Sequence, residues 1–161
     1  TMSNRIAVFN DGKIQQISSP DVLYEKPDSS FVAQFIGENN QLKGKVKSVN
    51  GNNCVIETST GENINSLKIN VNEVGQSSLV SLRPERVAIN SKDGNYENNF
   101  EASVEELIYL GDHVRTRVKV CGNDQFIVKV PNSSDQSDLK EGVKVKLSWK
   151  ADDTRALDYR S

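Results

Sequence analysis

"VRTRVKVCGNDQFIVKV", residues 114 to 130, has the clearest strand-like alternation in the chain. Apolar and basic residues alternate in its first half, with Val114, Val118 and Val120 on one face and Arg115, Arg117 and Lys119 on the other. Because successive side chains of a strand point to opposite faces, this period predicts a half-buried β-strand. Gly122 and Asn123 supply a tight turn into a second strand. The stretch therefore predicts a β-hairpin with its valine face toward a core.

The same short period continues through most of the chain after Gly37. Strand-like segments cover residues 42–49, 53–59, 79–89, 100–111, 114–120, 125–130 and 143–149, and clusters of Asn, Gly, Asp and Ser separate them. The alternation breaks at Glu105 and Glu106, which predicts a β-bulge there. Residues 131–142 are expected to be a polar loop, and the tail from residue 151 is a candidate for a final short strand. The sequence thus predicts a mainly β fold, either a small, partly closed antiparallel barrel or a pair of such sheets.

The first forty residues have a different pattern. Apolar stretches around the Asp11-Gly12 pair predict a β-hairpin over residues 5–17. Residues 19–37 then predict two short helices, with capping and stop residues at their ends. Large apolar side chains recur at i, i+4 spacing on the second helix: Phe31, Val32, Phe35 and Ile36. Nothing within residues 1–40 is large enough to cover them, so they are expected to dock on the barrel, to be buried in a second copy, or to be poorly ordered.

Composition excludes several classes of protein. The 161 residues include 20 basic and 22 acidic side chains, a net charge of -2, which is unfavourable for a nucleic-acid binder that must neutralise phosphates. No apolar run approaches the ~20 residues that span a bilayer, so a cytoplasmic location is expected. Cys54 and Cys121 are far apart in the sequence, and they are expected to be small buried apolar residues and not a disulfide or zinc site.

No catalytic, cofactor or metal site is predicted. The single histidine, His113, has no second histidine or cysteine near it in the sequence. In a strand, the adjacent acids of the pairs Glu105-Glu106 and Asp152-Asp153 point to opposite faces, which favours surface charge over a catalytic pair. The phosphate-binding pattern G-x-x-x-x-G-K-[ST] is absent, so the chain is expected to have no nucleotide site and no enzymatic activity of its own.

Two other patterns suggest local roles. Basic residues are expected to share the polar face of neighbouring strands: Arg115, Arg117, Lys119, Lys129, Lys144 and Lys146. Such a stripe suits an anion or a single nucleic-acid strand, but only Phe126 is close enough to supply stacking, so a solvated face balanced by acids is favoured. In "LRPERVAIN", residues 82–90, proline predicts a kink in a strand, and the flanking Arg83 and Glu85 are expected either to pair in a structural salt bridge or to reach a loop.

Several of these segments resemble a known family. Residues 2–40 resemble the end of the ATPase domain in the ATP-binding subunits of ABC importers, and residues 81–89, 109–120 and 142–157 resemble the TOBE domain that follows it. The resemblance implies an ATPase-domain remnant over 1–40 and an OB-like TOBE barrel over 41–161, with spermidine/putrescine-type subunits as the most similar. The Walker motifs, signature motif and switch histidine of that family have no counterpart here. The chain thus resembles a truncated subunit: a deliberate fragment, a product of proteolysis or the product of a split gene.

The resemblance also implies partners and sites. TOBE regions of the family pack against their twins, which implies homodimerisation through the barrel, with Arg83, Glu85, Tyr109 and Gly111 as interface, regulatory or fold-maintaining residues. Phe31, Val32, Phe35 and Ile36 would pack in the ATPase domain. The parent subunit would bind ATP and Mg and would sit with permease subunits at the cytoplasmic face of the inner membrane. The alternative is a free-standing barrel that binds a small anion or another small ligand.

Overall fold

The computed structural model of the chain describes residues 6–10, 13–18, 39–92, 94–132 and 139–159. Within these residues the fold is mainly β, as predicted, and the helical elements are two single 3-10 turns, η1 (Pro84–Arg86) and η2 (Ala151–Asp153). No helix in this described part of the chain is long and apolar enough to cross a membrane.

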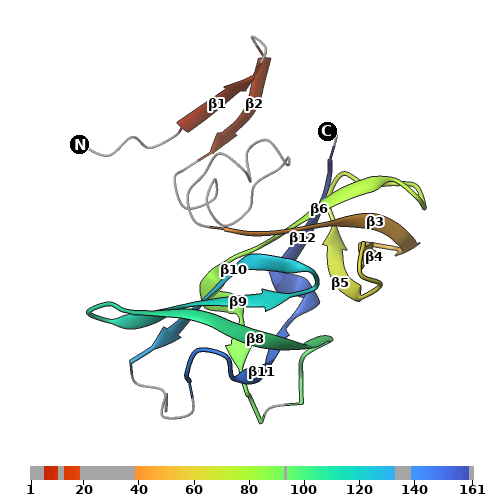
Figure 1. Cartoon of the computed structure of the whole chain (residues 1–161). Helices are drawn as coiled ribbons and strands as arrows, with labels where there is room; N and C mark the ends of the chain where they lie inside the picture. The colour runs from red at the N-terminus through yellow and green to blue at the C-terminus, as the bar shows by residue number, and fades with distance from the viewer. Residues whose placement is uncertain (1–5, 11–12, 19–38, 93, 133–138, 160–161) are drawn as a thin grey trace.

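The strands after residue 39 form two sheets (Figure 1). The first is a closed barrel in the order β12-β5-β4-β3-β6, built from β3 (Asn40–Asn50), β4 (Asn53–Thr58), β5 (Asn63–Lys68), β6 (Ser77–Leu82) and β12 (Thr154–Asp158). The second has the order β10-β9-β8-β11-β7 and contains β7 (Ala88–Ile89), β8 (Asn98–Tyr109), β9 (His113–Val120), β10 (Asn123–Pro131) and β11 (Lys144–Trp149). The expected barrel is confirmed, and a second sheet accompanies it.

The barrel closes through β12, which confirms the final short strand expected in the tail from residue 151. β12 pairs antiparallel with β6 and parallel with β5, where Arg155 lies opposite Leu67. The barrel is therefore antiparallel except at this seam. β5 is not among the predicted strands, because its sequence NINSLK is mostly polar and only Ile64 and Ser66 are fully buried.

The β9–β10 hairpin is confirmed, but its turn lies one residue earlier than predicted. Val120 pairs with Asn123, so the two turn residues are Cys121 and Gly122, with φ of 52° and 76°. Two-residue hairpin turns favour positive φ at both positions because their twist then matches that of the strands. Cys121 takes a conformation for which its residue type gives no sequence signal.

The predicted bulge in β8 is confirmed. Val104 lies opposite Val118 and Glu106 lies opposite Arg117, so Glu105 is the extra residue. The bulge keeps Val104 in the core while it turns Glu106 to the outer face beside Arg117.

One apolar core extends through both sheets. It runs from Leu42, Ile56 and Ile64 in the barrel to Val118, Phe126 and Trp149 in the second sheet. Trp149 is fully buried, with ring centroids 5.2 Å from Phe100 and 5.6 Å from Phe126. Because the two sheets share this close-packed core, a substitution that alters packing in one sheet also affects the packing of the other.

The amino-terminal hairpin is also confirmed. β1 (Ile6–Asn10) and β2 (Lys13–Ser18) pair antiparallel, with Ile6 opposite Ser18. The two helices predicted over 19–37, with their apolar residues Phe31, Val32, Phe35 and Ile36, lie outside the described residues.

Candidate functional site

Arg83 and Glu85 lie in the η1 turn between β6 and β7. Pro84 ends the strand and is buried, while the Arg83 guanidinium pairs with the Glu85 carboxylate two residues on. η1 packs against β10 of the second sheet. This geometry is the structural salt bridge that the sequence predicts, and it leaves only a sixth of the Arg83 side chain exposed (17%).

Tyr109 and Gly111 lie at the other candidate position, the turn between β8 and β9, which Figure 1 shows projecting from the second sheet. Three consecutive apolar side chains are exposed there: Ile108 (39%), Tyr109 (70%) and Leu110 (43%). We call these three residues the apolar tip. Ile108 and Tyr109 are the last two residues of β8 and point to opposite faces of that strand, and Leu110 follows them in the turn.

The turn that carries the apolar tip is held by hydrogen bonds. The Leu110 N–H donates to the His113 carbonyl at 2.9 Å. Asn132, just after β10, donates its side-chain amide to the Gly111 carbonyl at 2.9 Å and its backbone N–H to the Asp112 carbonyl at 3.2 Å. The tip is therefore exposed, but hydrogen bonds hold the backbone of its turn, and two of them come from Asn132 directly after β10.

His113 is the first residue of β9, directly after the β8–β9 turn. Its Nδ1 lies 2.6 Å from Oδ1 of Asp112, and this hydrogen bond lowers the pKa of the Asp112 carboxyl. Among the described residues, no cluster of three or more His, Cys, Asp or Glu side chains is placed to hold a metal ion.

The six basic residues of the predicted stripe do share one face of the second sheet. Lys129 lies opposite Arg115, and Ser103 of β8 lies between Lys119 and Lys144. Acids are interleaved: Glu101 pairs with Lys144 at 3.3 Å, and Glu106 lies 4.0 Å from Arg117. The favoured interpretation, a solvated face balanced by acids, agrees with this arrangement.

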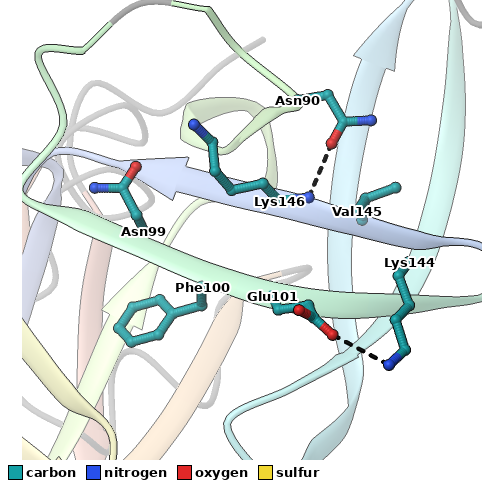
Figure 2. A pocket seen from close by; sticks show the side chains of 7 residues that line it. All are labelled: Asn90, Asn99, Phe100, Glu101, Lys144, Val145 and Lys146. Atoms are coloured by element: carbon teal, nitrogen blue, oxygen red, sulfur yellow. Dashed lines mark hydrogen bonds and ion pairs between the residues drawn. The ribbon is translucent and has the colours of Figure 1, made fainter.

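A groove of about 430 Å³ lies at the β7–β11–β8 end of that face. We call it the outer groove, and its lining residues are Asn90, Asn99, Phe100, Glu101, Lys144, Val145 and Lys146. Figure 2 shows Asn90, Asn99 and Lys146 on one side of the strands and Phe100 on the other. Asn90, at φ 51°, is fixed by exchange with Lys146: each backbone N–H finds an oxygen of the other residue at 2.8 Å.

Some residues of the apolar tip and of the outer groove are not predicted from the sequence. Ile108 and Leu110 of the tip were assigned only to a strand, although three apolar residues before a Gly-Asp turn were a usable signal. Asn90 and Asn99 of the outer groove gave none, because asparagine between strands usually indicates only a turn. The four candidate residues are not brought together: they occupy two separate turns, each of which contacts β10 or the residue after it.

Both cysteines are free; Cys54 is buried as predicted, whereas Cys121, in the β9–β10 turn, is only half-buried. Burial raises the pKa of the Cys54 thiol to about 11 and that of the Cys121 thiol to about 12. Because only the thiolate is a strong nucleophile, neither sulfur is prepared for covalent chemistry at neutral pH.

Comparison with known proteins gives these features a family context. Residues 80–157 match the TOBE domain family. The spermidine/putrescine import ATP-binding protein PotA of Trichodesmium erythraeum is 39% identical over 140 residues, and the same-named protein of Rubrobacter xylanophilus is 33% identical over 153 residues. The matches cover 83% and 94% of this chain but only 37% and 40% of those relatives.

The fold has a solved counterpart. The cytoplasmic molybdate-binding protein ModG, in a molybdate-bound crystal structure, superimposes with a TM-score of 0.65 over 78% of this chain and 99% of that one. The sequence identity is 15%, so this likeness concerns the fold.

Barrel, second sheet and matched residues together define a module of the TOBE type, an OB-like β-barrel. The chain is a relative of the C-terminal TOBE part of ABC-importer ATP-binding subunits, as its sequence resemblance predicts.

Proposed function

We propose that the chain is the C-terminal regulatory and dimerisation part of the ATP-binding subunit of an ABC importer for polyamine-type solutes. Support comes from relatives of 39% and 33% identity that carry the name spermidine/putrescine import ATP-binding protein. The chain spans about two fifths of their length, so ATP and Mg binding would belong to the remainder of such a subunit. In this proposal the subunit works with permease subunits at the cytoplasmic face of the membrane.

The apolar tip is the observation that carries the dimerisation role. Three large side chains are exposed at the end of β8 and the start of the hydrogen-bonded turn after it: Ile108, Tyr109 and Leu110. Two copies related by a two-fold axis would bring the same surface of each chain together, which buries both tips at once. Aromatic residues such as Tyr109 are enriched among the side chains that dominate interface energies.

Light scattering of the isolated chain tests this role. We expect a dimer that the double substitution Tyr109→Ser, Leu110→Ser converts to a monomer without loss of secondary structure. Val74→Ser is the matched control, because Val74 is equally exposed (69%) but lies in the β5–β6 connection. A wild-type monomer at high concentration, or a dimer that survives the double substitution, would contradict the role of the tip.

A second candidate is a barrel that binds a small anion. The outer groove favours it, because Lys146, Asn90 and Asn99 border one hollow, and the fold is shared with a molybdate-binding protein. The Glu101–Lys144 pair weakens it by bringing a negative charge to the same groove. Calorimetry with molybdate, sulfate and spermidine separates the two candidates: anion binding that Lys146→Met abolishes would support the second.

A further inference from the structure

Asn40 belongs to the barrel, but its side chain hydrogen-bonds to β10, an edge strand of the second sheet. It begins β3, where it lies opposite Leu82 of β6, and its side chain is 3% exposed. Its Nδ2 donates to the Ile127 carbonyl at 2.7 Å, and its Oδ1 accepts from the Ile127 N–H at 2.8 Å. One side-chain amide therefore supplies both hydrogen bonds that a residue on a neighbouring antiparallel strand would exchange with Ile127.

The residues on both sides of Asn40 add two further links. Asn39 donates to the Ser81 hydroxyl of β6 at 2.6 Å, a contact inside the barrel. Asn123, the first residue of β10, donates to the Gln41 carbonyl at 3.0 Å. Residues 39–41 thus hold β6 on one side and β10 on the other.

β10 in turn holds the apolar tip. At its far end, Asn132 donates to the Gly111 and Asp112 carbonyls of the β8–β9 turn. Backbone and hydrogen bonds therefore run without a break from Asn40 through Ile127 and Asn132 to the turn that presents Tyr109.

We propose that Asn40 is a latch that couples the barrel, through β10, to the position of the apolar tip. The proposal rests on the proposed function, in which the tip is the dimer contact. Loss of the Asn40 side chain would leave the buried N–H and carbonyl of Ile127 without these partners, which would weaken the attachment of β10 to the barrel.

Residue-resolved amide hydrogen exchange of the 161-residue chain tests the latch. Asn40→Ala is expected to speed exchange at Ile127 at least tenfold and to speed exchange at Leu110 and Asn132 as well. Asn39→Ala is the matched control: it removes a neighbouring asparagine whose partner, Ser81, lies within the barrel, and it should leave these three amides unchanged.

A second variant is available at an exposed position if Asn40→Ala does not fold. Asn132→Ala removes the side-chain link to Gly111 at the far end of β10, and it is expected to speed exchange at Leu110 while Ile127 stays protected. Unchanged exchange at Leu110 in this variant would overturn the coupling.

Three results with Asn40→Ala would overturn the latch: unchanged protection of Ile127, a change at Ile127 that does not reach Leu110 and Asn132, or an equal effect of Asn39→Ala. Exchange is measured at concentrations where the chain is monomeric, and light scattering at high concentration is measured on the same samples. A chain that never dimerises contradicts the proposed function alone, whereas the exchange pattern decides the latch.

Discussion

The Thr60 Cγ2 lies 3.0 Å from the point at which a Cβ on Gly122 would stand. Thr60 belongs to the β4–β5 turn of the barrel, and Gly122 belongs to the β9–β10 turn of the second sheet. A side chain at residue 122 would be in tight contact with Thr60, so glycine suits both the positive φ of its own turn and the close approach of the two turns.

Gly122→Ala should therefore destabilise the chain by about 1–3 kcal/mol, from the positive φ and the close contact with Thr60 together. Gly94→Ala is the control, because a Cβ at residue 94 meets nothing within 4 Å, and we expect about 0.5 kcal/mol or less. Urea unfolding followed by Trp149 fluorescence gives both values. Equal stability of the two variants would show that the turns do not constrain each other.

Glu62, in the same β4–β5 turn, is expected to titrate below its ordinary range. Burial acts to raise its pKa, but hydrogen bonds from the hydroxyls of Thr58, at 2.6 Å, and Thr60 and from a backbone N–H together lower it. Since the folded-state pKa is the lower one, the ionised carboxylate stabilises the fold above pH ~4.5, and this contribution is lost as the pH falls through the folded-state pKa.

Thr58→Val should move the pKa of Glu62 upward, which carboxyl-resolved NMR titration measures. Thr116→Val is the matched control, because Thr116 is equally buried but belongs to β9. A Glu62 pKa that stays put in Thr58→Val, or moves as far in Thr116→Val, would refute the assigned role of the Thr58 hydroxyl.

The two thiols should be nearly inert while the chain is folded. With the pKa of Cys54 raised to about 11 and that of Cys121 to about 12, labelling at pH 8 should be at least ~100-fold slower in the native chain than in guanidinium. Because both folded-state pKa values exceed the ordinary value of 9.0, the contribution of the two thiols to stability should be constant below pH ~9 and should fall as the pH rises toward 11 and 12. Rapid labelling in buffer would contradict the burial of either sulfur.

Much of the fold was predictable because local and tertiary preferences agree. The β9–β10 hairpin follows from alternation, since Val114, Val118 and Val120 are buried as their spacing indicates. The bulge at Glu105 was also predictable, because a break in the alternation of a strand indicates an extra residue. The Arg83–Glu85 pair was also within reach, because a proline between opposite charges limits how the backbone continues.

The remainder depends on contacts between segments far apart in the sequence. β5 is not predicted from the sequence because it has no continuous apolar face: Ser66 is one of its two buried residues, and the backbone of Asn65 exchanges hydrogen bonds with the distant Asn98. Asn40 gave no signal of its role, because its partner Ile127 lies 87 positions away. Asparagine at the start of a strand normally indicates a turn. Only the folded structure brings the Asn40 amide to Ile127, where it makes the hydrogen bonds that a neighbouring strand would make.

The proposed role of this chain is to dimerise and regulate an importer ATPase through the apolar tip. The most direct test is ATP hydrolysis by the natural polypeptide that contains these residues, measured against protein concentration. We predict hydrolysis whose rate per subunit rises as dimers form, and a Tyr109→Ser, Leu110→Ser variant that needs a higher concentration to reach the same rate. No hydrolysis, or a concentration dependence that the variant leaves unchanged, would contradict this role.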